Sequence, residues 1–388
     1  MDEHVKRMLD VSFSATMRIS KLADDMEANG SDIISLAVGE PDFDTPDFII
    51  EAAYEAMKQG FTHYTPPKGI RELRDAIAEN MRTENDLDFA SDNVLVTPTK
   101  HAIFMSVLAH LDDGAEAILP DPAWVSYGPI VKFADGILRR VPLQEDDFSI
   151  DEEAMKEAIT SRTEMMILNS PCNPTGMSFS KEEAKIIRDL AVDNDIKVVT
   201  DEVYEKLIFE GEHISLASLD GMRERTITVN GFSKAFAMTG WRIGWLACTE
   251  DLLENIAKIQ THSITCATSF AQKAAYRAMV EKEKSKKALN EMMDKYRERR
   301  EIIVKRLGEI EGFECKKPES TFYTFPRYEY DKEAMEMSMY LLREAKVATT
   351  PGTAFGDRGE NHLRLSFANS KENIEEAMDR IEEAVGKL

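Results

Sequence analysis

One stretch decides the fold of this chain: Asn230-Gly-Phe-Ser-Lys-Ala-Phe-Ala-Met-Thr-Gly-Trp-Arg-Ile-Gly-Trp245. It follows a β-branched run at residues 226–229 that predicts a buried strand. Its lysine, Lys234, stands among three large apolar side chains, those of Phe232, Phe236 and Met238. Such surroundings would remove water from an ammonium and lower its pKa, which makes a lysine a Schiff-base nucleophile near neutral pH.

Two further groups in this stretch could bind a phosphate. Arg242 can place a guanidinium fork on phosphate oxygens, and Ser233 can add a hydroxyl. A surface lysine and a structural arginine beside a tight turn are the alternative, which a lone Ser-Lys pair would favour. The full run and its spacing favour a site that combines a reactive amine with a bound phosphate.

Outward from this stretch, short apolar runs alternate with amphipathic helical patterns. The runs at 94–96, 117–119, 165–168 and 197–200 predict strands, and 101–111 and 181–194 predict helices. This alternation predicts an α/β fold with a mainly parallel sheet and helices on both faces. The candidate residues follow strands, where open α/β sheets bind ligands. No Gly-x-Gly-x-x-Gly and no P-loop follows a strand, which argues against a dinucleotide enzyme or an NTPase.

Composition narrows the class of protein further. The chain has 388 residues, enough for one large and one smaller domain, and 43% of them are apolar. A net charge of −23 disfavours nucleic acid and anionic membranes as partners. The apolar runs are too short to span a membrane, and the charged start lacks a signal-peptide pattern, so a cytoplasmic protein is expected. The four cysteines and seven histidines match neither a disulfide framework nor a metal site.

The stretch around Lys234 resembles the lysine motif of the class I/II aminotransferases, which are pyridoxal-phosphate (PLP) enzymes of fold type I. The resemblance extends from about Ser14 to the C-terminus. It implies a homodimer in which each chain has two domains. The large domain is built on a mainly parallel sheet of the seven-stranded type flanked by helices, and the smaller domain is α+β. The large PLP-binding domain is expected at residues 46–285, and the small domain at 1–45 and 286–388.

The resemblance also assigns residues to the cofactor ring. In Ser170-Pro-Cys-Asn-Pro-Thr-Gly176, Asn173 matches the asparagine that holds the ring's 3-oxygen, and Tyr204 would join it there. Asp201, at the end of a β-branched strand, is costly to bury without a partner, and a pyridinium N–H would supply one. Trp124 matches the aromatic residue that stacks on the ring, with a core tryptophan as its alternative.

The phosphate end of the cofactor is expected at the junction 97–100, where a strand passes into a helix. Helix N-termini suit anions, but Pro98 stands where the family has a small residue and offers no N–H. Thr99 can supply an N–H and a hydroxyl instead. Tyr64 matches a tyrosine that reaches the phosphate of the neighbouring subunit, with a partly buried loop tyrosine as its alternative.

Three residues are expected at the substrate. Arg364 lies in an alternating apolar strand, where a guanidinium needs an anionic partner, and the family's arginine grips the substrate α-carboxylate. Its alternative is an internal salt bridge. Gly39 belongs to a loop whose backbone lies over the substrate in this family. Lys100 matches a lysine that meets the distal carboxylate in some aspartate-preferring members and contacts the cofactor region, and a solvated lysine is the alternative.

The implied activity is transamination between an L-amino acid and a 2-oxo acid, with Lys234 as the cofactor-bearing base and Asp201 and Tyr204 supporting the ring. Aspartate with 2-oxoglutarate is the expected pair, a choice that rests on Lys100. An aromatic or alanine-type aminotransferase is the alternative, and a PLP-dependent lyase would share every cofactor residue. A DNA-binding regulator is disfavoured by the acidic charge and by the short segment before the large domain.

Overall fold

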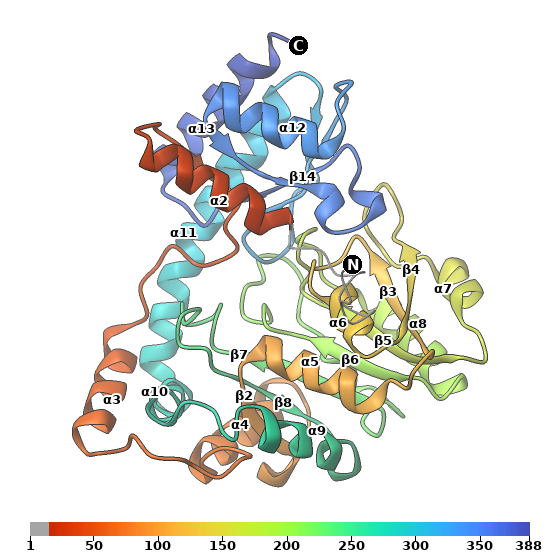
Figure 1. Ribbon diagram of the computed structural model, residues 1–388. Helices are drawn as coiled ribbons and strands as arrows, with labels where there is room; N and C mark the ends of the chain where they lie inside the picture. The colour runs from red at the N-terminus through yellow and green to blue at the C-terminus, as the bar shows by residue number, and fades with distance from the viewer. Residues whose placement is uncertain (1–14) are drawn as a thin grey trace, which may run out of the picture.

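The computed structural model describes residues 15–388, so the expectation about the charged start of the chain lies outside the described residues. A seven-stranded sheet occupies the lower part of the molecule (Figure 1). In spatial order its strands are β2 (Val94–Thr97), β8 (Gly244–Ala247), β7 (Thr226–Gly231), β6 (Lys197–Asp201), β5 (Thr163–Asn169), β3 (Glu116–Asp121) and β4 (Ile137–Pro142). Only β8 runs antiparallel to its neighbours, which confirms the prediction of a mainly parallel sheet.

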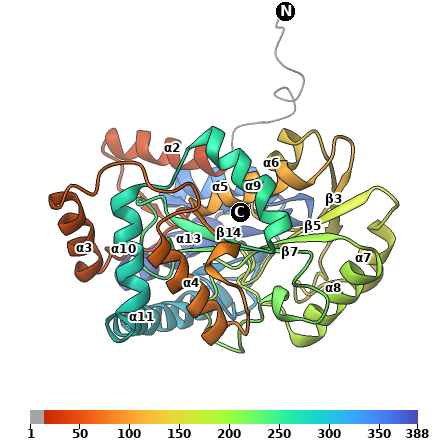
Figure 2. The same cartoon turned by 90° about the horizontal axis from the view of Figure 1, so that it is seen from below.

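Both faces of this sheet are covered by helices, as Figure 2 shows from below. One face carries α5 (Thr99–His110), α6 (Tyr127–Phe133) and α9 (Glu250–Ser263). The other carries α7 (Glu152–Ala158) and α8 (Lys181–Asp193) on one half, and α3 (Asp47–Lys58), α4 (Arg71–Glu84) and α10 (Ser269–Val280) on the other half. Along β5, Ile167 packs toward α5 while Leu168 packs toward α8, because successive side chains of a strand point to opposite faces.

A smaller α+β region lies above the sheet, joined to it by α11 (Lys282–Glu309) (Figure 1). Its three small sheets have the orders β1-β12, β10-β14-β13 and β11-β9. The strands are β1 (Ile34–Ser35), β9 (Phe313–Glu314), β10 (Tyr323–Thr324), β11 (Arg327–Tyr328), β12 (Val347–Ala348), β13 (Thr350–Pro351) and β14 (Leu363–Ser366). The helices α2 (Ala15–Ala28), α12 (Ala334–Tyr340) and α13 (Lys371–Val385) cover them.

The segment before the large sheet packs on the C-terminal part of the chain. Strand β1 pairs with β12 in parallel, and Ile19 and Ala23 of α2 share a core with Leu342 and Ala348. The predicted division at residue 285 falls inside α11, a single helix of 28 residues. None of the helices within residues 15–388 is both long enough and apolar enough to cross a membrane.

Candidate active site

A cavity of about 670 Å³ opens where strands β5, β6 and β7 end and where the small α+β region faces them. Carboxyl ends of parallel strands converge at one edge of a sheet, so residues far apart in sequence meet there. All predicted site residues except Tyr64 line this cavity, namely Gly39, Thr99, Lys100, Trp124, Asn173, Asp201, Tyr204, Ser233, Lys234, Arg242 and Arg364.

The Lys234 amine lies inside the cavity, beyond the end of β7. Its Nζ donates to the Gly39 carbonyl oxygen at 2.6 Å and lies 5.6 Å and 5.7 Å from the ring centroids of Tyr204 and Phe322. Burial, helped by the positive charge of Arg364, lowers the pKa of Lys234 to about 8. A neutral amine is therefore accessible just above neutral pH, as a nucleophile or base requires.

The apolar surroundings that the sequence predicted for Lys234 are only partly correct. Phe232 and Met238 belong to the core between the sheet and helices α4 and α10, and Phe236 packs against that core. The aromatic rings that contact the Lys234 ammonium are instead those of Tyr204 and Phe322, which lie far from Lys234 in the sequence. The segment after β7 forms turns, with Ala237 at a φ of 50°, so adjacency in sequence does not place these side chains around the amine.

Asp201 lies buried at the end of β6. Its Oδ2 accepts a hydrogen bond from the Tyr127 hydroxyl at 2.9 Å, and its Oδ1 accepts one from the Val203 amide at 3.3 Å. Burial raises the pKa of Asp201 to about 6, although these donors and Lys234 oppose the rise. Its carboxylate would be stabilised by a cationic N–H group in the cavity.

Tyr127 is a site residue that the sequence analysis did not assign. It is fully buried on the first turn of α6, where its ring meets that of Trp124 edge-on at 5.1 Å. Tyr127 stands three residues after Trp124, the one residue of the run 121–127 to which the sequence assigned a role. A buried hydroxyl must find a partner, which is the one signal that could have suggested a carboxylate neighbour.

Arg364 of β14 brings a guanidinium into the opposite wall of the cavity. It is 4% exposed and donates to Asn173 Oδ1 at 3.0 Å and to the Ala37 carbonyl oxygen at 2.6 Å. Its Nε has no partner, and no carboxylate of residues 15–388 forms an ion pair with it. The internal salt bridge considered as an alternative is absent from the described chain, so this buried cation lacks a counter-charge.

Gly39 closes the cavity beside Arg364. A Cβ at this position would lie 2.8 Å from the Tyr323 hydroxyl, which itself shares a hydrogen bond of 2.9 Å with the Tyr204 hydroxyl. Only glycine therefore fits between the N-terminal segment and these two tyrosines. The close approach also leaves the Gly39 carbonyl free to receive the Lys234 amine.

The N-terminus of α5, with Ser233 and Arg242, forms the other end of the cavity. Thr99 occupies the first turn of α5, and its hydroxyl approaches the Asn230 carbonyl oxygen at 3.4 Å. Ser233 is buried, whereas Arg242 is exposed and adopts a φ of 53° while donating to the Thr239 carbonyl oxygen at 2.9 Å. A hydroxyl, a helix N-terminus and a guanidinium converge as an anion site requires.

Lys100 stands at the exposed mouth of this cavity. Its Nζ lies 4.7 Å from the centroid of the Trp124 ring, a cation–π contact. Partial burial and the nearby charge of Arg242 lower the pKa of Lys100. The lysine therefore faces the cavity rather than open solvent alone, and it can reach an anionic group that enters there.

Tyr64 lies apart from the cavity of its own chain. It is 87% exposed on the loop between α3 and α4, so the partly buried loop tyrosine considered as its alternative is wrong. An exposed aromatic side chain on a stiff loop is available to a second subunit. Its predicted contact with the neighbouring phosphate stays a prediction.

Three side chains of metal-ligand type meet behind Asp201, although their spacing in sequence had not suggested it. The ligand atoms of Glu202, Glu205 and His213 lie within 4.8 Å of one another. Burial opposes a charge on His213, but Glu202 and Glu205 outweigh it and raise its pKa. With the Lys206 ammonium 3.4 Å from Glu205, we interpret the cluster as a network of ion pairs.

Comparison with known proteins agrees with this geometry. Residues 31–381 match the model of the family aminotransferase class I and II. The chain belongs to this family. It is 45% identical to an aspartate aminotransferase of Pyrococcus abyssi over 93% of its own length and 94% of the relative's. It is 43% identical to aromatic-amino-acid aminotransferase 2 of Thermococcus litoralis over 91% and 92% of the two chains.

A solved structure gives the same result for the whole fold. The aspartate aminotransferase of Thermus thermophilus with maleate superposes with a TM-score of 0.94 at 38% identity, covering 99% of this chain and 100% of that one. The fold is therefore that of the PLP-dependent transferases of fold type I. The protein is an aminotransferase, and PLP is its cofactor.

The residues in the cavity fit this cofactor. A buried carboxylate with a raised pKa, Asp201, can pair with a protonated ring nitrogen, and the amine of Lys234 can reach an aldehyde. The anion site at the start of α5 suits a phosphate. The charge, hydrogen-bonding capacity and position of these residues thus match the ring nitrogen, the aldehyde and the phosphate of PLP.

Proposed function

We propose that this aminotransferase exchanges an amino group between L-aspartate and 2-oxoglutarate. The observation that carries this proposal is the presence of two cationic groups at separate positions in one cavity. Arg364 is buried without a counter-charge, and Lys100 stands at the mouth beside Trp124. A dicarboxylate has one anionic group for each of them.

The position of the predicted residues in one cavity supports the cofactor contacts that the resemblance implies. Lys234 would bind the aldehyde carbon, Asp201 the ring nitrogen, and Asn173 and Tyr204 the ring oxygen, with Trp124 stacked on the ring. Thr99, Ser233 and Arg242 would bind the phosphate, with Tyr64 of a second subunit. When bound, PLP supplies an electron-accepting ring that stabilises negative charge at the substrate Cα.

The side chains of this protein would then bind the substrate and move one proton. Arg364 orients the α-carboxylate with its guanidinium fork, close to Asn173. The Lys234 amine, with its pKa lowered to about 8, would take the Cα proton as a general base and return it to the cofactor carbon that is bonded to the substrate nitrogen. Asp201 would supply the negative charge that the ring nitrogen needs, and Tyr127 holds its carboxylate in place.

We further propose a homodimer with shared active sites, located in the cytoplasm. The exposed Tyr64 supports the shared site, because it is positioned to act outside its own chain. The four unpaired cysteines suit a reducing compartment. The packing of α2 and β1 on the C-terminal part supports a small domain made of residues 1–45 and 286–388, beside a large domain at 46–285.

Aromatic amino acids are the second candidate substrates. A relative named for them is 43% identical to this chain, and the cavity carries the rings of Trp124, Tyr204 and Tyr323. The side chain of an aromatic substrate would pack against these rings, whereas the side-chain carboxylate of aspartate would bind Lys100. A panel of amino donors, each assayed with 2-oxoglutarate, separates the two candidates directly.

Replacing Lys100 by alanine tests the role of the second cation. We expect Lys100→Ala to lower kcat/KM for aspartate about tenfold to a hundredfold, because one charge-assisted contact is lost. The value for phenylalanine should change less than about threefold, since a ring makes no ion pair. Lys58→Ala removes an exposed lysine of α3 and is the matched control. Equal losses for both substrates would contradict the choice of aspartate.

A further inference from the structure

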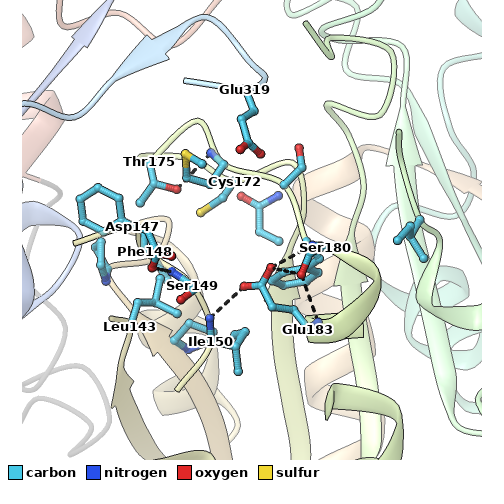
Figure 3. Close-up of a pocket in the computed structure, with 18 of the residues that line it drawn as sticks. Leu143, Asp147, Phe148, Ser149, Ile150, Cys172, Thr175, Ser180, Glu183 and Glu319 are labelled. Carbon is cyan, nitrogen blue, oxygen red and sulfur yellow. Dashed lines mark hydrogen bonds between the residues drawn. The ribbon is translucent and has the colours of Figure 1, made fainter. Parts of the chain in front are cut away.

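A second cavity, of about 630 Å³, lies beside the active site. The turns after β3, β4 and β5 line it from the large-sheet side, together with residues 210–214, while Lys316 and Glu319 close it from the small α+β region. Figure 3 shows the Glu319 carboxylate entering from one side, opposite the loop that carries Ser149. Cavities of this size bind small organic molecules.

The walls of this cavity combine apolar side chains with polar and charged ones, among them the lysines Lys181 and Lys316 and five carboxylates. Three of these carboxylates have partners within the protein. Glu183 accepts hydrogen bonds from the Ser180 hydroxyl at 2.7 Å and the Ile150 amide at 2.9 Å (Figure 3). Asp147 accepts from the Ser149 amide at 2.9 Å, and Glu210 pairs with Arg300, also at 2.9 Å. Each of these groups is therefore engaged by the protein itself.

Glu319 differs from these three carboxylates. It is partly buried and forms no ion pair with any described residue. Burial raises its pKa against the effects of the Lys316 charge and of a hydrogen bond from the Ser178 backbone amide. The Lys316 ammonium is directed elsewhere, since it donates to the Asp147 carbonyl oxygen at 2.9 Å. A partly buried carboxylate without an ion pair favours a cation, and the apolar side chains of the walls, such as Leu143 and Phe148, favour an apolar body on that cation.

Two residues separate this cavity from the active site and line both. Tyr127 donates to the Asp201 carboxylate, and the Asn169 side chain donates to the Asp201 carbonyl oxygen at 2.8 Å and accepts from the Asn173 amide at 2.9 Å. A ligand packed against them would shift Asp201 or Asn173, and a small displacement of catalytic groups lowers a rate strongly.

We propose that this second cavity is an effector site for a small organic cation with an apolar body, held by Glu319, and that its occupation slows transamination through Tyr127 and Asn169. The site is distinct from the substrate cavity, so the effector should lower kcat while leaving the KM of the amino donor unchanged. The donor used is whichever one the enzyme converts fastest, so the outcome does not depend on aspartate being the substrate.

Calorimetric titration of the PLP-loaded enzyme with benzyltrimethylammonium tests the proposal, because a quaternary ammonium cannot react with the cofactor. We expect one site per chain, with no comparable binding of benzyl alcohol, which has the ring without the charge. Glu319→Gln should weaken binding at least about tenfold, as expected for a lost charge-assisted contact. Ser149→Phe should weaken it as well by filling the cavity.

Glu314→Gln is the matched control, because Glu314 is exposed five residues away and does not line the cavity. Thermal melting verifies that each variant is folded. Saturating ligand should lower kcat at least about twofold in the parent enzyme and have no effect in Glu319→Gln. Binding that is equal in Glu319→Gln and the parent, competition with the amino donor in KM, or an unchanged kcat at saturation would each overturn the proposal.

Discussion

At the scale of single residues, burial moves the pKa of Lys234 and that of Asp201 toward each other. For Lys234 the value falls from 10.5 to about 8, so the reactive neutral amine forms as the pH rises through 8. We expect the covalent uptake of PLP by the cofactor-free protein to accelerate about tenfold per pH unit below 8 and to level off above it. Borohydride trapping at timed intervals measures this uptake.

Lys234→Ala is the control for that experiment, since no amine is left at the position and no label should be trapped on the corresponding peptide. A midpoint near the ordinary lysine pKa would show that the cavity does not desolvate this amine. Trapping on another lysine of the fully loaded protein would refute the assignment of Lys234.

Tyr127 makes a second prediction at this scale. Tyr127→Phe removes one hydrogen bond to the Asp201 carboxylate, and because the ring is kept it creates no large cavity. We expect kcat to fall about tenfold, which corresponds to ~1.4 kcal/mol, with little change in KM. The pH profile of kcat should move upward on its acidic limb, because Asp201 loses a donor that lowers its pKa.

Tyr328→Phe supplies a matched control for the loss of a buried hydroxyl. Its hydroxyl donates to the Lys332 carbonyl oxygen at 2.8 Å, remote from the cavity. Both variants should lose similar stability in thermal melting, but only Tyr127→Phe should lose activity. If Tyr127→Phe and Tyr328→Phe lowered kcat equally, the effect of Tyr127 would arise from a general loss of structure and not from its contact with Asp201.

The sequence allowed much of the site to be predicted, and the reason is geometric. Asn173 and Lys234 follow strands with a clear apolar pattern and Asp201 ends one, and parallel strands bring their ends together. The role of Tyr127 was not predicted because its contact with Asp201 spans 74 positions in sequence and depends on how α6 packs. The surroundings of Lys234 were partly wrong because adjacent residues were assumed to share its environment.

At the scale of elements, the N-terminus of α5 is held by two glycines of the neighbouring strands. A Cβ on Gly231 of β7 would lie 2.3 Å from the Thr99 hydroxyl, and one on Gly244 of β8 would lie at the same distance. We expect Gly231→Ala to displace the first turn of α5, weaken PLP binding at least about tenfold and cost ~1–3 kcal/mol of stability. Equilibrium dialysis and thermal melting measure the two effects.

Gly240→Ala is the control within the same segment, because a Cβ there would meet nothing within 4 Å. It should leave PLP affinity and melting temperature near those of the parent. If Gly231→Ala also retained full PLP affinity, the start of α5 would not contribute to phosphate binding.

Element boundaries show what local patterns omit. The antiparallel strand β8 and the edge strand β4 were not predicted, since β4 exposes Arg139 and Arg140 and β8 lies inside the motif itself. Helix α10 ends at Val280 and α11 begins at Lys282, so the chain interrupts the helical run only at Glu281. Charged residues lowered the apparent helical pattern there, whereas packing and ion pairs maintain the helix.

At the scale of the whole molecule, the active-site cavity gathers positive charge in a protein whose net charge is strongly negative. The chain carries a net charge of −23, yet Lys100, Arg242 and Arg364 all line the same cavity. Negative charge elsewhere on the surface repels anions at long range, so an anionic cofactor or substrate must be bound by short-range contacts with cationic groups such as these. Of the residues predicted for the site, Tyr64 is the one that lies outside the cavity of its own chain.

The exposed Tyr64 therefore makes the last prediction, that a site of one chain is completed by a second. Tyr64→Ala should weaken PLP binding about tenfold, and Lys234→Ala should abolish activity. A hybrid of these two variants, isolated with different tags, would contain one site with both Lys234 and Tyr64 intact, contributed by different chains. At a limiting PLP concentration we expect this hybrid to retain about half of the parent activity. If Tyr64 acted within its own chain, the hybrid would have no complete site, and its activity would fall to half that of the Tyr64→Ala dimer or less.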